Sequence, residues 1–270
     1  MTAFCSARVE VADGVYLTVD GNSKITAGNG TFTKPKPNAF SLPSPDTCVG
    51  ATTACRKACY TRGLRANAPE LAQAYCENLA VVRNTLALPA ANRNAAVARF
   101  ANWIEAHCLG GFRWHVSGDF FSREYAAWVA DVCWASRHVR HWVYTRALCY
   151  VDELVGVPNL VVNVSADLDN YTRARRTADH SGCRLCYFAR AGEAIPTDLR
   201  PGDVIFPDYP LRLRLGGETP EAAAWWNALS LADKRRVCPA DMWGQSETRR
   251  CTVPGAYAGC TRCTTAELET

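Results

Sequence analysis

Three cysteines, Cys48, Cys55 and Cys59, lie within the thirteen-residue segment CVGATTACRKACY. Thiolates are soft ligands that bind zinc and iron–sulfur clusters. A structural zinc site usually takes four ligands from two short C-x2-4-C knuckles. Here the intervals are six and three residues, and the next cysteine, Cys76, falls inside an expected helix. The segment therefore offers three ligands, which suits a 4Fe-4S cluster with one iron left open better than it suits zinc.

The cysteine content of the whole chain also indicates metal binding. Fourteen cysteines in 270 residues are many for a reducing cytosol and too few per residue for a small secreted disulfide scaffold. The amino terminus lacks a basic start followed by an apolar run, and no window approaches the roughly 18 apolar residues of a membrane helix. We therefore expect a cytoplasmic metalloprotein with no membrane partner.

Composition and charge narrow the function classes further. The chain is 48% apolar, and its net charge of +4 permits a nucleic-acid partner without requiring one. The sequence contains no glycine-rich phosphate loop, no G-x-S-x-G elbow and no H-E-x-x-H motif. These absences argue against P-loop nucleotide hydrolases, α/β-hydrolases and zinc proteases.

A second group of cysteines follows in the carboxyl-terminal half. Four thiols predict a closed site that holds zinc or a second 4Fe-4S cluster, and their positions are Cys238, Cys251, Cys260 and Cys263. Cys183 and Cys186 form another C-x2-C pair that could replace two of these ligands. The sequence leaves open which four of the six bind together.

Expected strands and helices alternate through the middle of the chain. Apolar runs at 112–119, 141–147, 159–167, 183–191 and 203–206 predict strands, and helical periodicity marks 69–88, 90–108, 122–135, 169–180 and 220–230. Residues 15–19 and 23–28 suggest short strands, and 34–46 suggest a long loop into the cysteines. Alternation of this kind predicts an α/β fold with parallel strands, a βα barrel or an open sheet.

Polar residues gather where these expected strands end. The ends are Ser117-Gly118-Asp119, Thr145-Arg146, Ser165-Ala166-Asp167 and Arg190. In a βα barrel or an open parallel sheet, ligands bind at the carboxyl ends of the strands. We therefore expect a binding site at this edge, beside the cysteine loop.

These motifs resemble two known families. The cysteine triad followed by a strand-end SGD is similar to the radical S-adenosylmethionine (radical SAM) enzymes. More narrowly, ACRKACY, RWHVSGDFFSREYAAWV, HWVYTRA and VSAD resemble an uncharacterised bacteriophage family of the same organisation. The resemblance implies a partial (β/α) barrel of radical SAM type over 1–210, with a cysteine-rich extension over 211–270. It also implies location in the host cytoplasm.

The radical SAM resemblance assigns roles to the matching positions. The three cysteines of the first triad would ligate three irons, and the amino and carboxylate groups of SAM would bind the fourth. The cofactor-binding residues would be Ser117, Gly118, Asp119, Asn163 and Ser165. Most members of that superfamily space their cysteines by three and two residues, whereas this chain spaces them by six and three.

Four further residues near the same edge of the sheet are candidates for catalysis: His115, Tyr144, Arg146 and Asp167. His115 either transfers protons near its ordinary pKa or packs in the core against backbone groups. Together these features predict a radical SAM-type enzyme that takes an electron from a donor and generates a substrate radical.

The sequence does not identify the substrate. A phage context and mild basicity favour a nucleobase or nucleotide, with a peptide or small metabolite as alternatives. Two other functions remain open. One is a non-catalytic iron–sulfur or zinc protein that binds nucleic acid or a replication partner, and the other is a cluster enzyme that does not use SAM.

Overall fold

A computed structural model describes residues 6–21, 36–59, 61–108, 110–208 and 219–238. These residues form one eight-stranded sheet whose strands lie side by side in chain order. The strands are β1 (Ser6–Ala12), β2 (Val15–Gly21), β3 (Pro37–Phe40), β4 (Phe112–Trp114), β5 (His141–Thr145), β6 (Leu160–Ala166), β7 (Arg184–Ala189) and β8 (Val204–Pro207). β1, β2 and β3 pair antiparallel, and β3 through β8 pair parallel. The expected α/β class with parallel strands is therefore confirmed.

Helices lie between most of the parallel strands, and two more follow the last strand. They are α1 (Thr53–Lys57), α2 (Leu64–Asn67), α3 (Pro69–Leu86), α4 (Ala90–His107), α5 (Arg123–Ala135), α6 (Tyr171–Ser181), α7 (Pro220–Ala228) and α8 (Leu231–Arg236), with a 3-10 helix η2 at Leu148–Glu153. The Ser122 hydroxyl accepts a bond from the Tyr125 N–H and so caps α5, as its sequence position predicts. Gly182 ends α6 in the left-handed conformation, at φ +64°.

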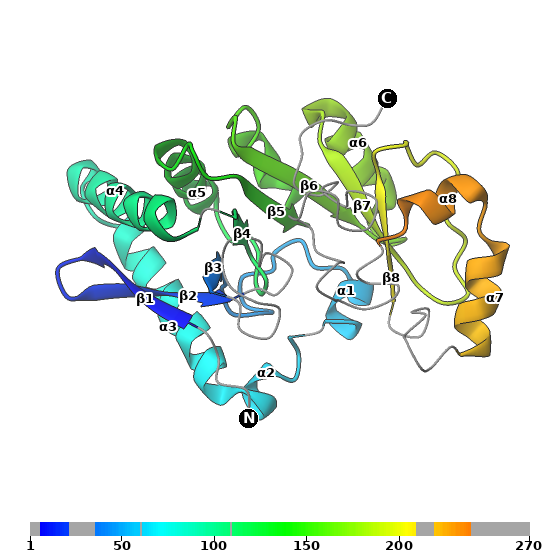
Figure 1. The fold of residues 1–270 in the computed structure, drawn as a ribbon, viewed down its shortest axis with the longest axis horizontal. Helices are drawn as coiled ribbons and strands as arrows, with labels where there is room; N and C mark the ends of the chain where they lie inside the picture. The colour runs from blue at the N-terminus through cyan, green and yellow to red at the C-terminus, as the bar shows by residue number, and fades with distance from the viewer. Residues whose placement is uncertain (1–5, 22–35, 60, 109, 209–218, 239–270) are drawn as a thin grey trace.

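The sheet has two unlike faces. Alternate residues of each strand point to opposite faces, and one set forms the main apolar core: Phe40, Trp114, Val143, Val164, Leu185 and Ile205. Helices α4, α5 and α6 pack on this helix-covered face, along the upper side of the sheet in Figure 1. The other set, which includes Arg113, Tyr144 and Ser165, lies on the opposite face, called here the inner face.

Strand β3 corrects one expectation. The long loop expected over 34–46 contains a strand, because residues 37–40 pair with β2 on one side and β4 on the other. Pro37 is the first residue of that strand, a position where the missing N–H costs little. Asn38, Ala39 and Phe40 are buried, so tertiary pairing outweighs the local preference for a loop.

Several boundaries also differ from the expected ones. The strand expected over 112–119 ends at Trp114, so the polar residues after it belong to a loop. Strand β1 and the short helices α1, α2 and α8 were not expected from the sequence, and the strand expected at 23–28 lies outside the described residues. The described part of 211–270 reaches the sheet, because Val237 bridges Ile205 of β8. None of the described helices combines the length and the apolar character needed to cross a bilayer.

Candidate functional site

The three cysteines of the first triad line one cavity of about 840 Å³. Eight residues from the inner face and the strand ends line the same cavity: Arg113, His115, Ser117, Gly118, Asp119, Tyr144, Arg146 and Ser165. Most of the site residues expected from the sequence are therefore brought together beside the cysteine loop. Asp167 and Asn163 are buried and are not among the lining residues; Asp167 accepts a bond from Thr52 of the cysteine loop, and Asn163 donates to the Val143 carbonyl.

A serine hydroxyl lies between two of the thiols. The Ser44 Oγ atom is 3.6 Å from the Cys48 Sγ atom, which donates to it, and 3.5 Å from the Cys59 Sγ atom. The Thr61 Oγ1 atom is 3.1 Å from the same Cys59 sulfur. Hydroxyl groups therefore orient Cys48 and Cys59 at the edge of the cavity.

The thiols differ in how easily they ionise. Burial raises the pKa of Cys48 to about 11. Burial also raises the pKa of Cys55, although the nearby Arg146 cation opposes this rise. For Cys59, hydrogen bonds from the Thr61 and Ser44 hydroxyls and from backbone N–H groups outweigh burial and lower the pKa. A thiol must lose its proton to bind a metal, and a bound metal promotes that loss.

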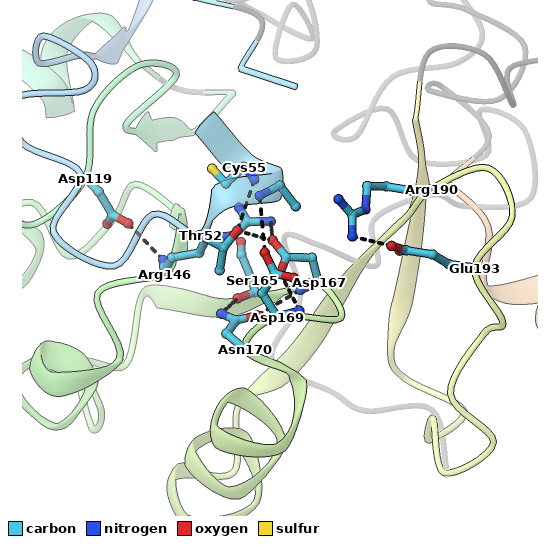
Figure 2. Close-up of polar contacts among 11 residues, drawn as sticks. Thr52, Cys55, Asp119, Arg146, Ser165, Asp167, Asp169, Asn170, Arg190 and Glu193 are labelled. Carbon is cyan, nitrogen blue, oxygen red and sulfur yellow. Dashed lines mark hydrogen bonds and ion pairs between the residues drawn. The ribbon is translucent and has the colours of Figure 1, made fainter. Parts of the chain in front are cut away.

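The cysteine loop is held against the ends of β5 and β6 by specific contacts. A Cβ atom on Gly50 would lie 1.8 Å from the Arg146 carbonyl oxygen, so only glycine fits where the loop crosses β5. The Thr52 hydroxyl donates to Asp167 at 2.5 Å and also accepts from the Cys55 N–H, which caps α1. Figure 2 shows these bonds beneath Cys55.

The SGD motif after β4 is part of the same scaffold. The Asp119 carboxylate accepts from the Thr145 hydroxyl at 2.6 Å and from the backbone N–H groups of Arg146 and Phe120, both at 2.8 Å. Burial raises its pKa. Gly118 has φ +80°, and a Cβ atom there would lie 2.6 Å from the Thr47 hydroxyl. The glycine thus allows close approach to the start of the cysteine loop, and the carboxylate joins the ends of β4 and β5.

Arg146 and Asp167 form a partly buried ion pair under the loop. The Arg146 Nη2 atom lies 3.4 Å from the Asp167 carboxylate, which is fully buried and also accepts from the Asp169 N–H. The Asp169 carboxylate in turn accepts from the Ala54 N–H at the start of α1. The strand-end acids of β6 therefore anchor the loop that carries Cys55.

His115 is a buried neutral ring. It adopts φ 58°, which is uncommon for a residue other than glycine, and its Nε2 atom lies 2.8 Å from the Tyr125 hydroxyl. The Phe120 ring lies 4.6 Å away between centroids. Burial lowers the pKa of His115 to about 3, far from the near-neutral value that proton transfer at physiological pH favours. The ring is therefore packed in the core, but its hydrogen bond is to the Tyr125 side chain and not to the expected backbone groups, and the residue also lines the cavity.

Three residues near the cavity were missed by sequence reasoning. Arg113 lies over the Tyr144 ring, 5.1 Å from its centroid. Tyr75 lines the cavity and donates to the Asp20 carboxylate at 2.7 Å. Burial raises the pKa of Asp20 to about 6. The available signal was a charged residue among apolar neighbours in an expected strand, FRW for Arg113 and LTVD for Asp20.

The second cysteine group is only partly described. Cys186 and Cys238 are buried in one small cluster with Val204, and the Cys186 thiol points to the Asn163 amide oxygen at 3.9 Å. Cys183 packs instead against the main core, on the opposite face of the sheet. The other three cysteines, Cys251, Cys260 and Cys263, lie outside the described residues. Cys183 and Cys186 therefore do not face the same side, as the two thiols of a metal knuckle would.

The donor set of the triad is three thiols, a ligand type that both zinc and iron–sulfur clusters take. Among the residues that the structure describes, no three His, Cys, Asp or Glu side chains converge on one point that could hold a single metal ion. The three thiols are instead spread around one cavity. In a cubane cluster each thiolate binds a separate iron, which requires ligands around a volume rather than around one ion.

Comparison with known proteins places the chain in a family. It matches the family model described as Gene product 88 over residues 16–266. The chain belongs to the Gene product 88 family. It is 29% identical over 200 residues to the "Gene 88 protein" of Mycobacterium phage L5, covering 71% of this chain and 80% of the relative. The corresponding protein of Mycobacterium phage D29 is 28% identical over 214 residues, covering 75% and 84%.

No solved structure matches the chain. The bacteriophage family indicated by the sequence motifs is confirmed, since both relatives are mycobacteriophage proteins. The matched range contains both cysteine groups. These names identify a phage gene and state no activity, so the function must be argued from the site.

Proposed function

We propose that this chain is an iron–sulfur enzyme of the radical SAM type, with Cys48, Cys55 and Cys59 as ligands of a 4Fe-4S cluster. One observation carries the proposal. Three thiols line one cavity, on a loop that Gly50 and Thr52 hold against the carboxyl ends of two parallel strands. That edge of a parallel sheet is where cofactors and substrates bind.

The strand order supports the finer fold assignment. Strands β3 to β8 are parallel and follow one another in chain order, with α4, α5 and α6 on one face. Right-handed connections in sequential order keep helices on one side, which is the arrangement of a (β/α) barrel. The proposal therefore takes the sheet as a partial barrel whose inner face lines the cavity.

The side chains of the cavity have distinct tasks in this proposal. When bound, a reduced cluster and SAM together supply radical chemistry that removes hydrogen from unactivated carbon. Ser44 and Thr61 orient two of the thiols through their hydroxyls. The Arg146 cation beside Cys55 favours the thiolate form, which is the form that binds iron.

The remaining polar groups divide into scaffold and ligand contacts. Asp119 and Asp167 already accept several internal bonds, so they hold the strand-end loops in place. Ser117 and Ser165 are left to contact SAM or substrate from the cavity wall, with Tyr144 on the inner face. His115 supports the wall as a neutral ring bonded to Tyr125.

A second metal site is part of the proposal. Cys186 and Cys238 share one buried cluster, which supports a site that includes these two cysteines together with cysteines of the tail. Cys183 lies on the opposite face and is left out of it. Zinc and a second 4Fe-4S cluster both suit four thiolates.

Anaerobic purification followed by metal analysis tests the proposal. Iron, sulfide and zinc are quantified in the full chain, which is then reduced with dithionite in the presence of SAM and assayed for 5′-deoxyadenosine. We expect at least about four irons per chain, from one cubane cluster, and formation of deoxyadenosine. Zinc as the only metal would contradict the proposal.

Two variants make the test specific. Cys55→Ala should lose the iron of the first cluster and all deoxyadenosine formation. Cys149→Ala removes an exposed cysteine outside both groups and should change neither. Iron without deoxyadenosine favours a cluster enzyme that does not use SAM. Oligonucleotide binding without deoxyadenosine favours the non-catalytic alternative.

A further inference from the structure

The cavity is lined by more positive than negative side chains. The cations are Arg56, Lys57, Arg62, Arg113 and Arg146, and the acids are Asp46 and Asp119. Asp119 is buried and already accepts three bonds from within the protein. Cations that share a concave site raise the local concentration of anions. The charge pattern therefore points to an anionic ligand.

The cations fall into two groups with different partners. In the interior, Arg146 pairs with Asp167, and the Asp20 carboxylate interacts electrostatically with Arg113. At the rim, the exposed side chains of Arg56, Lys57 and Arg62 take part in none of the ion pairs found among the described residues. Within the described part of the chain, positive charge without an ion-pair partner is thus concentrated on the segment that carries Cys55 and Cys59.

Buried polar atoms of the cavity lining, those of Ser117 and Arg146 together with the His115 Nδ1 atom, add an independent indication. The Ser117 Oγ atom and the Arg146 Nε atom are buried and have no hydrogen-bond partner within the described part of the chain. Ser117 is only 4% exposed. Leaving such a group unpaired costs about 1–3 kcal/mol, so these atoms indicate a ligand with oxygen acceptors.

We propose that the cavity binds a phosphorylated small molecule as substrate. Its phosphate groups contact Arg56, Lys57 and Arg62 at the rim, and its oxygen-bearing remainder reaches Ser117 and Arg146. This inference rests on the proposed function, because it names the substrate class of the same cavity. The volume of about 840 Å³ lies within the range of small-molecule sites, and it includes the space that the proposed cluster and SAM would take.

The shape of the site favours a small molecule over a nucleic-acid strand. A strand needs a cationic groove that tracks several phosphates, with aromatic faces for the bases. Here the three rim cations lie on one seven-residue stretch, and the Tyr144 ring is already covered by Arg113. One or two phosphate groups are enough to pair with the three rim cations.

Calorimetric titration of the full chain with inorganic pyrophosphate tests the inference. The titration is performed anaerobically at constant ionic strength, without SAM and without reductant. We expect saturable binding, weakened at least about tenfold in the triple variant Arg56→Ala, Lys57→Ala, Arg62→Ala. All three side chains are exposed, so the variant should fold normally.

Two further variants serve as controls. One tests for nonspecific attraction to surface charge, and the other tests for binding of phosphate in the interior of the cavity. Arg137→Ala with Arg140→Ala removes two exposed cations near the amino end of β5, and it should leave pyrophosphate binding unchanged. Ser117→Ala should leave pyrophosphate affinity within about twofold, because the inference assigns the phosphates to the rim. Equal weakening in the rim and control variants would show nonspecific charge attraction and overturn the inference.

Other outcomes also decide the question. Absence of saturable pyrophosphate binding overturns the inference, and so does tighter binding of a ten-residue oligothymidylate that depends on the same three rim cations. Because the titration omits SAM and reductant, its failure leaves the deoxyadenosine result standing. If pyrophosphate binds at the rim but no deoxyadenosine forms, the proposed function fails, and the rim is then a phosphate site unrelated to a radical enzyme.

Discussion

The two faces of the sheet have different compositions although they alternate along the same strands. In β4, Trp114 packs against Phe100 and Trp128 from the helices, while its neighbour Arg113 lies over Tyr144 on the inner face. In β6, Val164 belongs to the main core, and the next residue, Ser165, lines the cavity. Apolar burial on one face stabilises the fold, so the other face is free to carry polar and reactive groups.

The sharpest test of this comparison replaces one residue on each face. Trp114→Ala should reduce the free energy of unfolding by about 3–5 kcal/mol, because it empties a fully buried aromatic site. Ser165→Ala on the inner face should cost about 1 kcal/mol or less. Urea denaturation of both variants measures the difference. Equal losses would show that the inner face contributes as much stability as the helix-covered face.

Replacement of Asp20 tests whether ionisation of a buried carboxyl group on the inner face destabilises the folded state. It shares a row of the sheet with Arg113 and contacts Tyr75 and Ser41, and burial raises its pKa from 3.8 to about 6. The folded state therefore holds the proton more tightly than the unfolded state. The resulting stabilisation is fully present below pH 3.8 and is lost as pH rises through about 6, in total about 3 kcal/mol.

The measurement for Asp20 is a difference between two proteins. Wild type and Asp20→Asn are unfolded in urea at several pH values between 4 and 7, and the variant should gain stability relative to wild type as pH rises. Two buried histidines, His115 and His141, have pKa values lowered to about 3 and titrate with the opposite sign. Subtraction removes their contribution. A pH-independent difference would contradict the prediction.

Gly50 tests how closely the cysteine loop depends on β5. Gly50→Ala should cost about 1–3 kcal/mol, because its Cβ atom would meet the Arg146 carbonyl, and the displaced loop should also retain less iron. Gly14→Ala is the matched control. It has φ +71° but nothing within 4 Å of the added Cβ atom, so it should cost less and leave the iron content unchanged. Similar iron loss in both variants would argue against specific docking of the loop.

Thr52 gives the smallest expected effect. Thr52→Val removes the bond to Asp167 and the cap of α1, and it should cost about 1 kcal/mol and speed iron loss to a chelator. Thr219→Val removes an equivalent cap, on α7, away from the cysteine loop. It should cost no more stability than Thr52→Val and should leave the chelation rate unchanged. Equal chelation rates in the two variants would contradict the anchoring role of Thr52.

Much of the architecture was accessible from local patterns. Strand and helix periodicity, Ser122 as a helix cap and polar residues at the strand ends each depend on neighbours in the sequence, and the structure bears them out. The strand at 37–40 was not accessible. Its pairing partners lie in β2 and β4, about twenty and seventy residues away, and only that pairing makes a proline-rich stretch extended.

The candidate site likewise has some features that the sequence indicates and others that only the structure shows. The cysteine triad and its neighbouring strand ends are visible as residue types and spacing, and these features by themselves determined the expectation of a metal site at one edge of a parallel sheet. Which polar groups remain open to a ligand is a different kind of question. Asp119 and Asp167 are occupied by bonds to distant residues, whereas the Ser117 hydroxyl is not.

Only the tertiary structure decided those partners, together with the opposite faces of Cys183 and Cys186 and the position of Arg113 over Tyr144. The physical reason is that hydrogen bonding, burial and charge pairing join residues far apart in the chain. The periodicity of a strand indicates that its side chains alternate. It does not indicate which face the helices will cover or which acceptor each buried donor will meet.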